Sequence, residues 1–137
     1  MKIAVDFDGT IVENKYPKIG KPQLFAFETL LQLQKKGHQL ILWTYRYGEA
    51  LDEAVEFCRE NGLEFYAVNK SFPEEDYDPR MSRKINVDLF IDDKNLGGFP
   101  GWSEVWSILH PEIYGDPDFK ADSNRKVSLL EKIFGKK

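Results

Sequence analysis

Short apolar runs alternate with longer amphipathic stretches along the first two thirds of the chain. Four of these runs predict buried strands, because they are apolar, contain β-branched or aromatic residues and adjoin turn-forming positions: 3–6, 39–44, 63–68 and 87–91. A strand–helix–strand order of this kind predicts a parallel sheet with right-handed crossovers. The expected fold is therefore α/β, with a Rossmann-like parallel sheet.

The stretch 22–36 has the spacing of an amphipathic helix. Pro22 suits the first turn, where its missing N–H costs nothing, and Gly37 follows two lysines as a stop signal. Apolar side chains recur on one face at helical spacing and predict a buried stripe of Leu24, Phe27, Leu30 and Leu31. We therefore expect a helix over 22–36.

The stretch 48–61 repeats this pattern and ends before Gly62. Its apolar face consists of Leu51, Ala54, Val55 and Cys58. Free cysteine is among the residue types most often found in protein interiors, so Cys58 is predicted to lie in the core.

Two shorter helices are predicted towards the C-terminus. Ser103 can cap a helix that runs to Leu109. Asp122 and Ser123 can cap a last helix with the apolar stripe Val127, Leu130 and Phe134. Residues 69–83 lie between the third and fourth predicted strands, carry prolines and acidic residues, and show no periodicity, which predicts a long loop.

Length and composition indicate an ordinary globular chain. Its 137 residues suit one domain over 1–137, and 42% hydrophobic and 31% charged residues exclude a disordered composition. A net charge of −4 does not indicate nucleic-acid binding. One cysteine excludes a disulfide framework, and with no membrane span or signal peptide expected, we predict a cytoplasmic protein.

Carboxylates follow two of the predicted strands. Asp6 and Asp8 end the first strand, Gly9 allows a sharp turn, and the pair Asp92–Asp93 ends the fourth. The carboxyl ends of parallel strands meet at one sheet edge, where ligands bind in open α/β folds, and Thr44 ends the second strand there. These residues taken one at a time fit either ordinary turns or a site where a cation neutralises the carboxylates.

The sequence Asp6-Phe7-Asp8-Gly9-Thr10 resembles the first motif of the haloacid dehalogenase superfamily of phosphatases. Thr44 matches the second motif, Lys84 the third, and Asp92–Asp93 the fourth, in the family's order. Arg83 and Lys70 are rival candidates for the cationic role of Lys84. The resemblance covers residues 2–93 and implies the three-layer parallel-sheet fold of this superfamily.

The resemblance implies a Mg²⁺-dependent phosphatase in which Asp6 attacks phosphorus and Asp8 acts as general acid and then base. Phosphate-binding residues would be Phe7, Thr44, Tyr45 and Lys84. Mg²⁺ would be held by Asp6, the backbone carbonyl of Asp8, and Asp92 or Asp93. The gaps between motifs are too short for the family's cap domain, so a capless member is expected, acting on a phosphorylated small molecule or macromolecule.

Two other interpretations belong to different functional classes. A receiver-like phosphoacceptor also uses carboxylates, a threonine and a lysine on a parallel sheet, but its acceptor lies in mid-chain, whereas here the Asp-x-Asp pair opens the chain. A non-catalytic metal-binding scaffold would keep the carboxylates without turnover. The loop 69–83 fits either a partial lid that grips the leaving group through Tyr77, Arg80 and Arg83, or a mobile surface loop.

Overall fold

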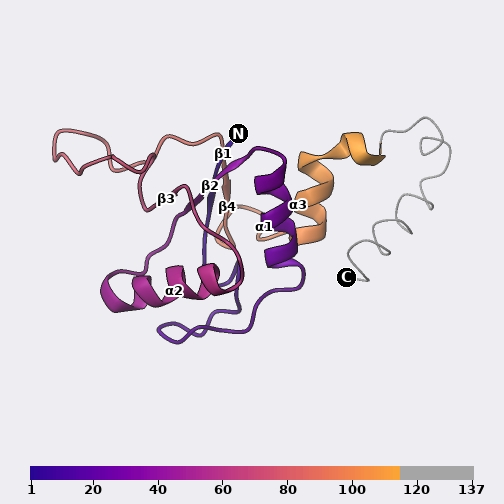
Figure 1. The fold of residues 1–137 in the computed structure, drawn as a ribbon, viewed down its shortest axis with the longest axis horizontal. Coiled ribbons are helices and arrows are strands. Elements are labelled where there is room, and N and C mark those ends of the chain that lie inside the picture. The colour runs from indigo at the N-terminus through magenta and orange to yellow at the C-terminus, as the bar shows by residue number, and fades with distance from the viewer. Residues whose placement is uncertain (115–137) are drawn as a thin grey trace. The chain divides into compact units, whose positions relative to one another are not determined.

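The computed structural model describes residues 1–114 (Figure 1). The chain divides into two compact units, Met1–Phe99 and a second that begins at Pro100. The first unit contains β1 (Lys2–Val5), α1 (Ala26–Lys35), β2 (Gln39–Leu42), α2 (Gly48–Glu60), β3 (Ala67–Val68) and β4 (Leu89–Ile91). In the second, the described elements are α3 (Trp102–Leu109) and a 3-10 turn (Pro111–Tyr114).

The four strands form one parallel sheet in the order β3-β2-β1-β4. β1 lies inside the sheet, with Val5 paired to Leu42 of β2 on one side and to Ile91 of β4 on the other. The predicted α/β, Rossmann-like parallel sheet is therefore confirmed. This register aligns the carboxyl ends of β1, β2 and β4, where the candidate functional residues follow.

The two faces of the sheet have different cores. Strand alternation puts Ile3, Val5, Leu40 and Leu42 on one face, and all four side chains are fully buried. Phe57 of α2 contacts Phe27 of α1 and Phe7 edge-on, with ring centroids 5.9 and 6.4 Å apart. The opposite face centres on Ala4, Ile41, Ala67 and Ile85. Full burial of a leucine or isoleucine contributes roughly 1.5–3 kcal/mol.

The helix predicted over 22–36 exists, but its predicted start is wrong. α1 begins at Ala26, because Pro22 forms a short antiparallel bridge with Val12 and Phe25 adopts a left-handed conformation with φ 63°. Leu24 therefore lies outside the helix and is 60% exposed. The buried residues of α1 are Ala26, Phe27, Thr29, Leu30 and Leu33.

The helix predicted over 48–61 is confirmed as α2, and Cys58 is fully buried as predicted. Burial raises the pKa of its thiol to about 12. The third strand is shorter than predicted, since regular pairing covers only two residues.

The helix predicted over 103–109 is confirmed as α3, which begins one residue earlier. The assignment of Ser103 as its cap is wrong, because Gly101 precedes the helix at φ 98° without a side-chain cap and Ser103 is buried inside it. The helix predicted after Asp122 lies outside the described residues.

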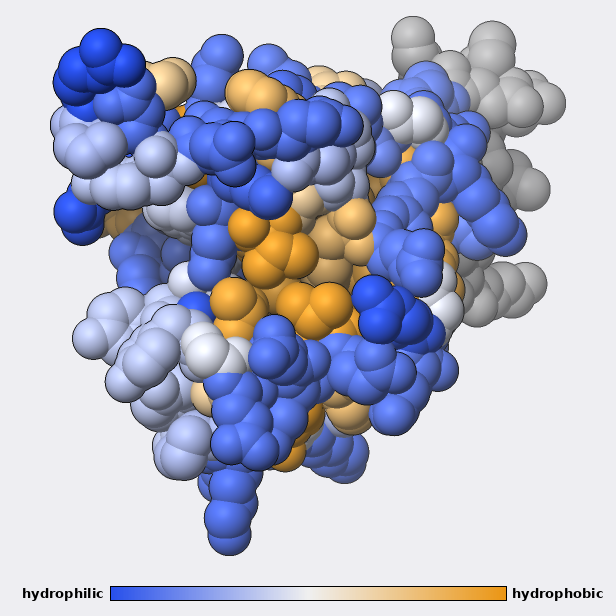
Figure 2. Space-filling model, turned by 60° about the vertical axis from the view of Figure 1, so that its left-hand side comes forward, coloured by the Kyte–Doolittle hydropathy of each residue, from blue (hydrophilic) through white to orange (hydrophobic). Residues whose placement is uncertain are grey.

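The loop predicted over 69–83 is confirmed. It is longer than predicted, since no helix or strand occurs over 69–88. This segment extends away from the strands in Figure 1. Figure 2 shows a largely hydrophilic face with one apolar area at its centre. No helix within residues 1–114 has the length and apolar character needed to cross a membrane.

Candidate active site

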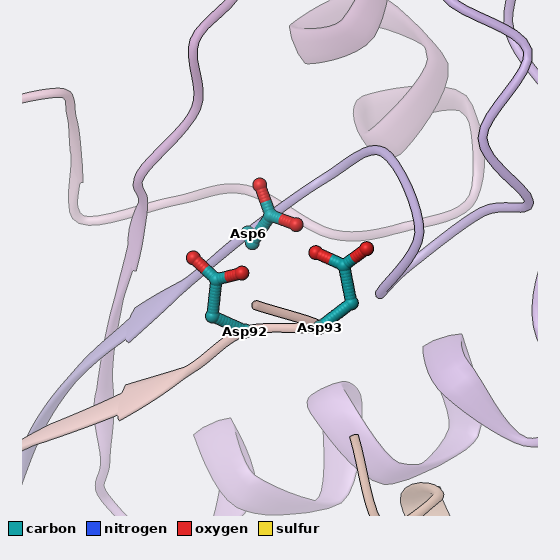
Figure 3. A group of neighbouring side chains, drawn as sticks. All are labelled: Asp6, Asp92 and Asp93. Carbon is teal, nitrogen blue, oxygen red and sulfur yellow. The ribbon is translucent and has the colours of Figure 1, made fainter. Parts of the chain in front are cut away.

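The register of β1 and β4 brings three carboxylates together. Asp6 directly follows β1, and its N–H donates to the carbonyl of Ile91 at 2.9 Å. Asp92 and Asp93 directly follow β4, so their side chains lie beside Asp6 (Figure 3). One oxygen from each of the three carboxylates lies within 4.8 Å of the others. We predicted from the sequence that these residues meet at one sheet edge, and in the structure they do so.

Gly9 makes the close approach of Asp93 possible. It adopts φ +89°, and a Cβ at this position would lie 2.3 Å from Oδ2 of Asp93. Any other residue would therefore meet both a strained backbone and a steric clash. The same turn carries Thr10, whose buried hydroxyl donates to Oδ2 of Asp6 at 3.0 Å.

The environment of Asp6 disfavours its charged form. Burial is the main cause that raises its pKa from 3.8 to about 7, and the negative charge of Asp92 adds to it. The hydrogen bond from Thr10 acts in the opposite direction. The cluster thus stores electrostatic repulsion that a cation would relieve. Three carboxylates also form the oxygen-rich ligand set that hard divalent cations such as Mg²⁺ take.

Asp8 lies apart from this cluster and is bound by Arg46. The Nε–H of Arg46 donates to Oδ2 of Asp8, and its Nη2–H donates to Oδ1, both at 2.7 Å. Its remaining donors reach the carbonyls of Pro17, Lys18 and Ala50 at 2.9–3.2 Å. All five N–H groups of the guanidinium are therefore used. Arg46 ties Asp8 to the loop before α1 and to the first turn of α2.

Arg46 is also enclosed by aromatic rings. Its side chain is fully buried, with the guanidinium carbon 5.0 Å from the ring centroid of Phe7 and 5.2 Å from that of Tyr16. Hydrogen bonding to Asp8 raises the pKa of Arg46, so the guanidinium stays charged. Sequence reasoning missed this residue. The signal that could have found it is a cation two residues after Thr44, at the edge where carboxylates gather.

Thr44 is fixed at the end of β2. Its N–H donates to Oδ1 of Asn69 at 2.8 Å, and its hydroxyl oxygen accepts from the N–H of Arg46 at 3.1 Å. Asn69 has the uncommon φ of 54°, and its own N–H donates to Leu42 at 2.7 Å. The hydroxyl hydrogen of Thr44 remains able to donate to a ligand. Asn69, a further residue missed from the sequence, thus positions Thr44.

A cavity of about 550 Å³ collects these groups. Its lining contains Asp6, Asp8, Asn14, Tyr16, Trp43, Thr44, Tyr45, Asp92, Asp93 and Lys94. Tyr45 is 89% exposed, whereas Phe7 is fully buried and does not line the cavity, so its predicted contact with phosphate stays a prediction. Lys94, missed from the sequence, has its Nζ 3.9 Å from Oδ2 of Asp93.

Lys84 does not line this cavity. It lies with Lys70 and Arg83 in the lining of a second cavity of about 510 Å³, formed largely by residues 69–85. Trp43 lines both cavities, which makes them neighbours. The predicted contact of Lys84 with a phosphoryl group therefore stays a prediction.

Comparison with known proteins gives one solved relative. The structure of a conserved protein from Bacteroides thetaiotaomicron matches with a TM-score of 0.77 and 56% sequence identity over 82% of this chain and 91% of that chain. At this identity and coverage, the two chains belong to the same family. No protein-family model matches the chain, and no curated protein does.

The enclosure of Arg46 predicts a large stability effect. Arg46→Ala should lower the free energy of unfolding by about 3–5 kcal/mol, because it leaves the Asp8 carboxylate without its partner. Urea unfolding measures this change. Arg59→Ala is the matched control, since its pair with Glu56 is half exposed and should cost less than about 1 kcal/mol. Similar small losses in both variants would show that the Asp8 pair is not structurally important.

The raised pKa of Asp6 predicts a pH-dependent stability. In metal-free protein the folded state favours protonated Asp6, so its contribution is full below pH 4 and is lost as pH rises towards about 7. Asp6→Asn should therefore stabilise the metal-free protein at pH 8, on the order of 1 kcal/mol after solvent screening, and should have little effect near pH 4.

Thermal unfolding with a chelator at both pH values measures this difference. Asp52→Asn removes an exposed carboxylate of α2 and should change stability equally at both pH values. A stabilisation by Asp6→Asn that is the same at pH 4 and pH 8 would contradict the assigned repulsion.

Proposed function

We propose that this protein is a Mg²⁺-dependent phosphatase of the haloacid dehalogenase type, with the three-layer fold of that superfamily. The observation that carries the proposal is the meeting of Asp6 with Asp92 and Asp93 at the strand ends, beside Thr44. These residues stand in the order of the family's motifs in the sequence. A non-catalytic scaffold would keep the same carboxylates in the same cavity, and turnover distinguishes the two.

The electrostatics of the cavity fit phosphate chemistry that is assisted by a cation. A phosphate monoester is a dianion and would be repelled by three neighbouring carboxylates. Asp6 with a pKa of about 7 would also be a poor nucleophile while it is protonated. A divalent cation favours the carboxylate form of its ligands, because opposite charge lowers the pKa of a carboxyl group.

Asp6, Asp92 or Asp93, and the main-chain carbonyl of Asp8 would hold the Mg²⁺ ion. When bound, this ion would screen the negative charges of the substrate and the carboxylates. The ligand set contains only oxygen atoms, as Mg²⁺ prefers. The hydrogen bond from Thr10 would orient Asp6 towards the cavity.

In the proposed reaction, an oxygen of Asp6 attacks phosphorus in line and forms an aspartyl-phosphate as the leaving-group oxygen departs. For this step Asp8 must enter as the neutral acid: it gives its proton to that oxygen and, as the resulting carboxylate, takes a proton from the water that hydrolyses the aspartyl-phosphate. Arg46 fixes the position of Asp8 through one contact on each oxygen. Since a carboxylate oxygen has two lone pairs, Asp8 keeps the capacity to handle a proton.

The remaining groups would bind the phosphoryl oxygens. The hydroxyl of Thr44 and the main chain near Phe7 and Tyr45 would donate hydrogen bonds. Lys84 would supply positive charge that stabilises the transition state. Lys94 is a rival for that role, because its side chain already lines the cavity.

Asp6→Asn tests the function directly. This variant should hydrolyse p-nitrophenyl phosphate with Mg²⁺ at least about 10³-fold more slowly than the unchanged protein, since it lacks the nucleophile. Steady-state kinetics measures the loss, circular dichroism checks the fold, and Asp52→Asn serves as the control with unchanged turnover. Retention of a tenth or more of the rate by Asp6→Asn would falsify the proposal, as would full turnover with a chelator in place of Mg²⁺.

Alanine variants of four cations test the role assigned to Lys84. The expected ranking of losses in kcat/KM puts Lys84→Ala first, on the order of 10²-fold, because it removes transition-state stabilisation. Lys70→Ala, Arg83→Ala and Lys94→Ala are measured under the same conditions with the same aryl phosphate. A larger loss for Lys94→Ala would transfer the role to that residue.

A further inference from the structure

The cavity beside the candidate active site has the position of a second subsite. Its volume of about 510 Å³ is similar to the 550 Å³ of the carboxylate-lined cavity, and each is large enough for a small organic ligand. Trp43 lines both, so a molecule bound at Asp6 could extend past its ring into the second cavity. Residues 69–85 supply all of the remaining lining.

The charged groups of this second cavity favour an anion. Lys70 and Lys84 have no ion-pair partner within residues 1–114. The acidic side chains are mostly engaged elsewhere. Arg80, which does not line the cavity, forms a two-pronged pair with Asp78 at 2.8–3.2 Å. Glu75 accepts a hydrogen bond from the N–H of Ser71.

Of the three carboxylates in the lining only Asp78 has a cationic partner among the described residues, so Glu75 and Asp76 stand against the three positive charges of Lys70, Arg83 and Lys84. The ion pair of Asp78 also bears on the predicted lid. Asp78 already occupies Nε and Nη2 of Arg80, and Arg80 does not line the cavity, so its predicted contact with a substrate stays a prediction.

Aromatic groups in the same lining favour a flat ring. Tyr77 is 68% exposed, its hydroxyl accepts from Nη2 of Arg83 at 3.1 Å, and the Arg83 guanidinium lies 5.4 Å from its ring centroid. Trp43 is held at the end of β2 by its N–H bond to Val5 at 2.9 Å. Nucleobases stack on tyrosine and tryptophan, and arginine strengthens such sites through cation–π contacts.

We propose that the second cavity binds a leaving group that contains an aromatic ring and its own phosphate, which makes a nucleoside bisphosphate the substrate class. This inference rests on the proposed phosphatase function. Hydrolysis would break the bond between phosphorus and one ribose oxygen. That oxygen gains a proton, water supplies the oxygen that ends on phosphorus, and the products are inorganic phosphate and a nucleoside monophosphate.

A comparison of kcat/KM for two nucleotides tests the inference. A nucleoside 3′,5′-bisphosphate should have at least about tenfold higher kcat/KM than the nucleoside 5′-monophosphate, since only the former places one phosphate in each cavity. Tyr77→Ala should reduce this preference about tenfold through KM, whereas Tyr77→Phe keeps the ring and most of the preference. Lys70→Gln should also weaken the preference.

Two controls make the result specific. Turnover of glycerol 2-phosphate by Tyr77→Ala should stay within about twofold of the unchanged protein, because this leaving group has no ring to stack in the subsite. Tyr47→Ala removes a tyrosine that is similarly exposed, at 73%, and lines neither cavity, so it should leave the preference unchanged. Equal kcat/KM for both nucleotides, or a preference that survives Tyr77→Ala, would overturn the inference.

A binding measurement separates this inference from the proposed function. A nucleoside 5′-monophosphate, titrated calorimetrically into the protein, should bind about tenfold more weakly to Tyr77→Ala than to the unchanged protein or Tyr47→Ala. Absence of aryl phosphate turnover would refute the phosphatase, and this titration would still report on the subsite. Turnover of aryl phosphate without nucleotide binding would refute the subsite alone.

Discussion

Repulsion among Asp6, Asp92 and Asp93 is the constraint on which the candidate site depends. Three carboxylates with oxygens within 4.8 Å of one another gain nothing from packing, and burial makes the charge of Asp6 still less favourable. The sheet imposes this arrangement, because pairing of β1 with β4 determines where the residues after both strands lie. Hydrophobic burial on both sheet faces thus compensates for a local repulsion, which the cation of the proposed function would relieve.

The buried charge of Arg46 is stabilised by the protein itself. Arg46 has all five N–H groups satisfied and a carboxylate partner, so its burial is compatible with stability, whereas loss of one partner is costly. The candidate site therefore has one carboxylate, Asp8, that is held by a buried cation, and a cluster of three whose cationic contact is the 3.9 Å pair of Asp93 with the exposed Lys94. Asp8 is preorganised by the protein, while the cluster is prepared for a ligand.

The strands and the parallel sheet could be predicted from the sequence, because local apolar patterns indicate them. The sheet edge at which the site residues meet could be predicted for the same reason. Asp6, Thr44, Asp92 and Asp93 could be located because each follows a strand. The position of Arg46 two residues after Thr44 places it at this edge, but its burial and its pairing with Asp8 could not be predicted, because that partner lies 38 residues away. The predicted start of α1 was wrong for a similar reason: the bridge from Pro22 to Val12 outweighed the local preference of proline for a helical first turn.

The position of Lys84 in the order of motifs did not predict its position in space. A motif fixes a residue type at a sequence interval, but residues 69–88 form a long segment without regular structure, so the interval does not determine where the side chain lies. The same segment forms the second cavity and places Tyr77 and Lys70 next to Trp43. In the proposed phosphatase, this one segment would bring a cation to the phosphoryl group and contact the rest of the substrate. Residues 69–88 are the whole connection between β3 and β4, so under the proposed function no other part of that connection would be available to contact the leaving group.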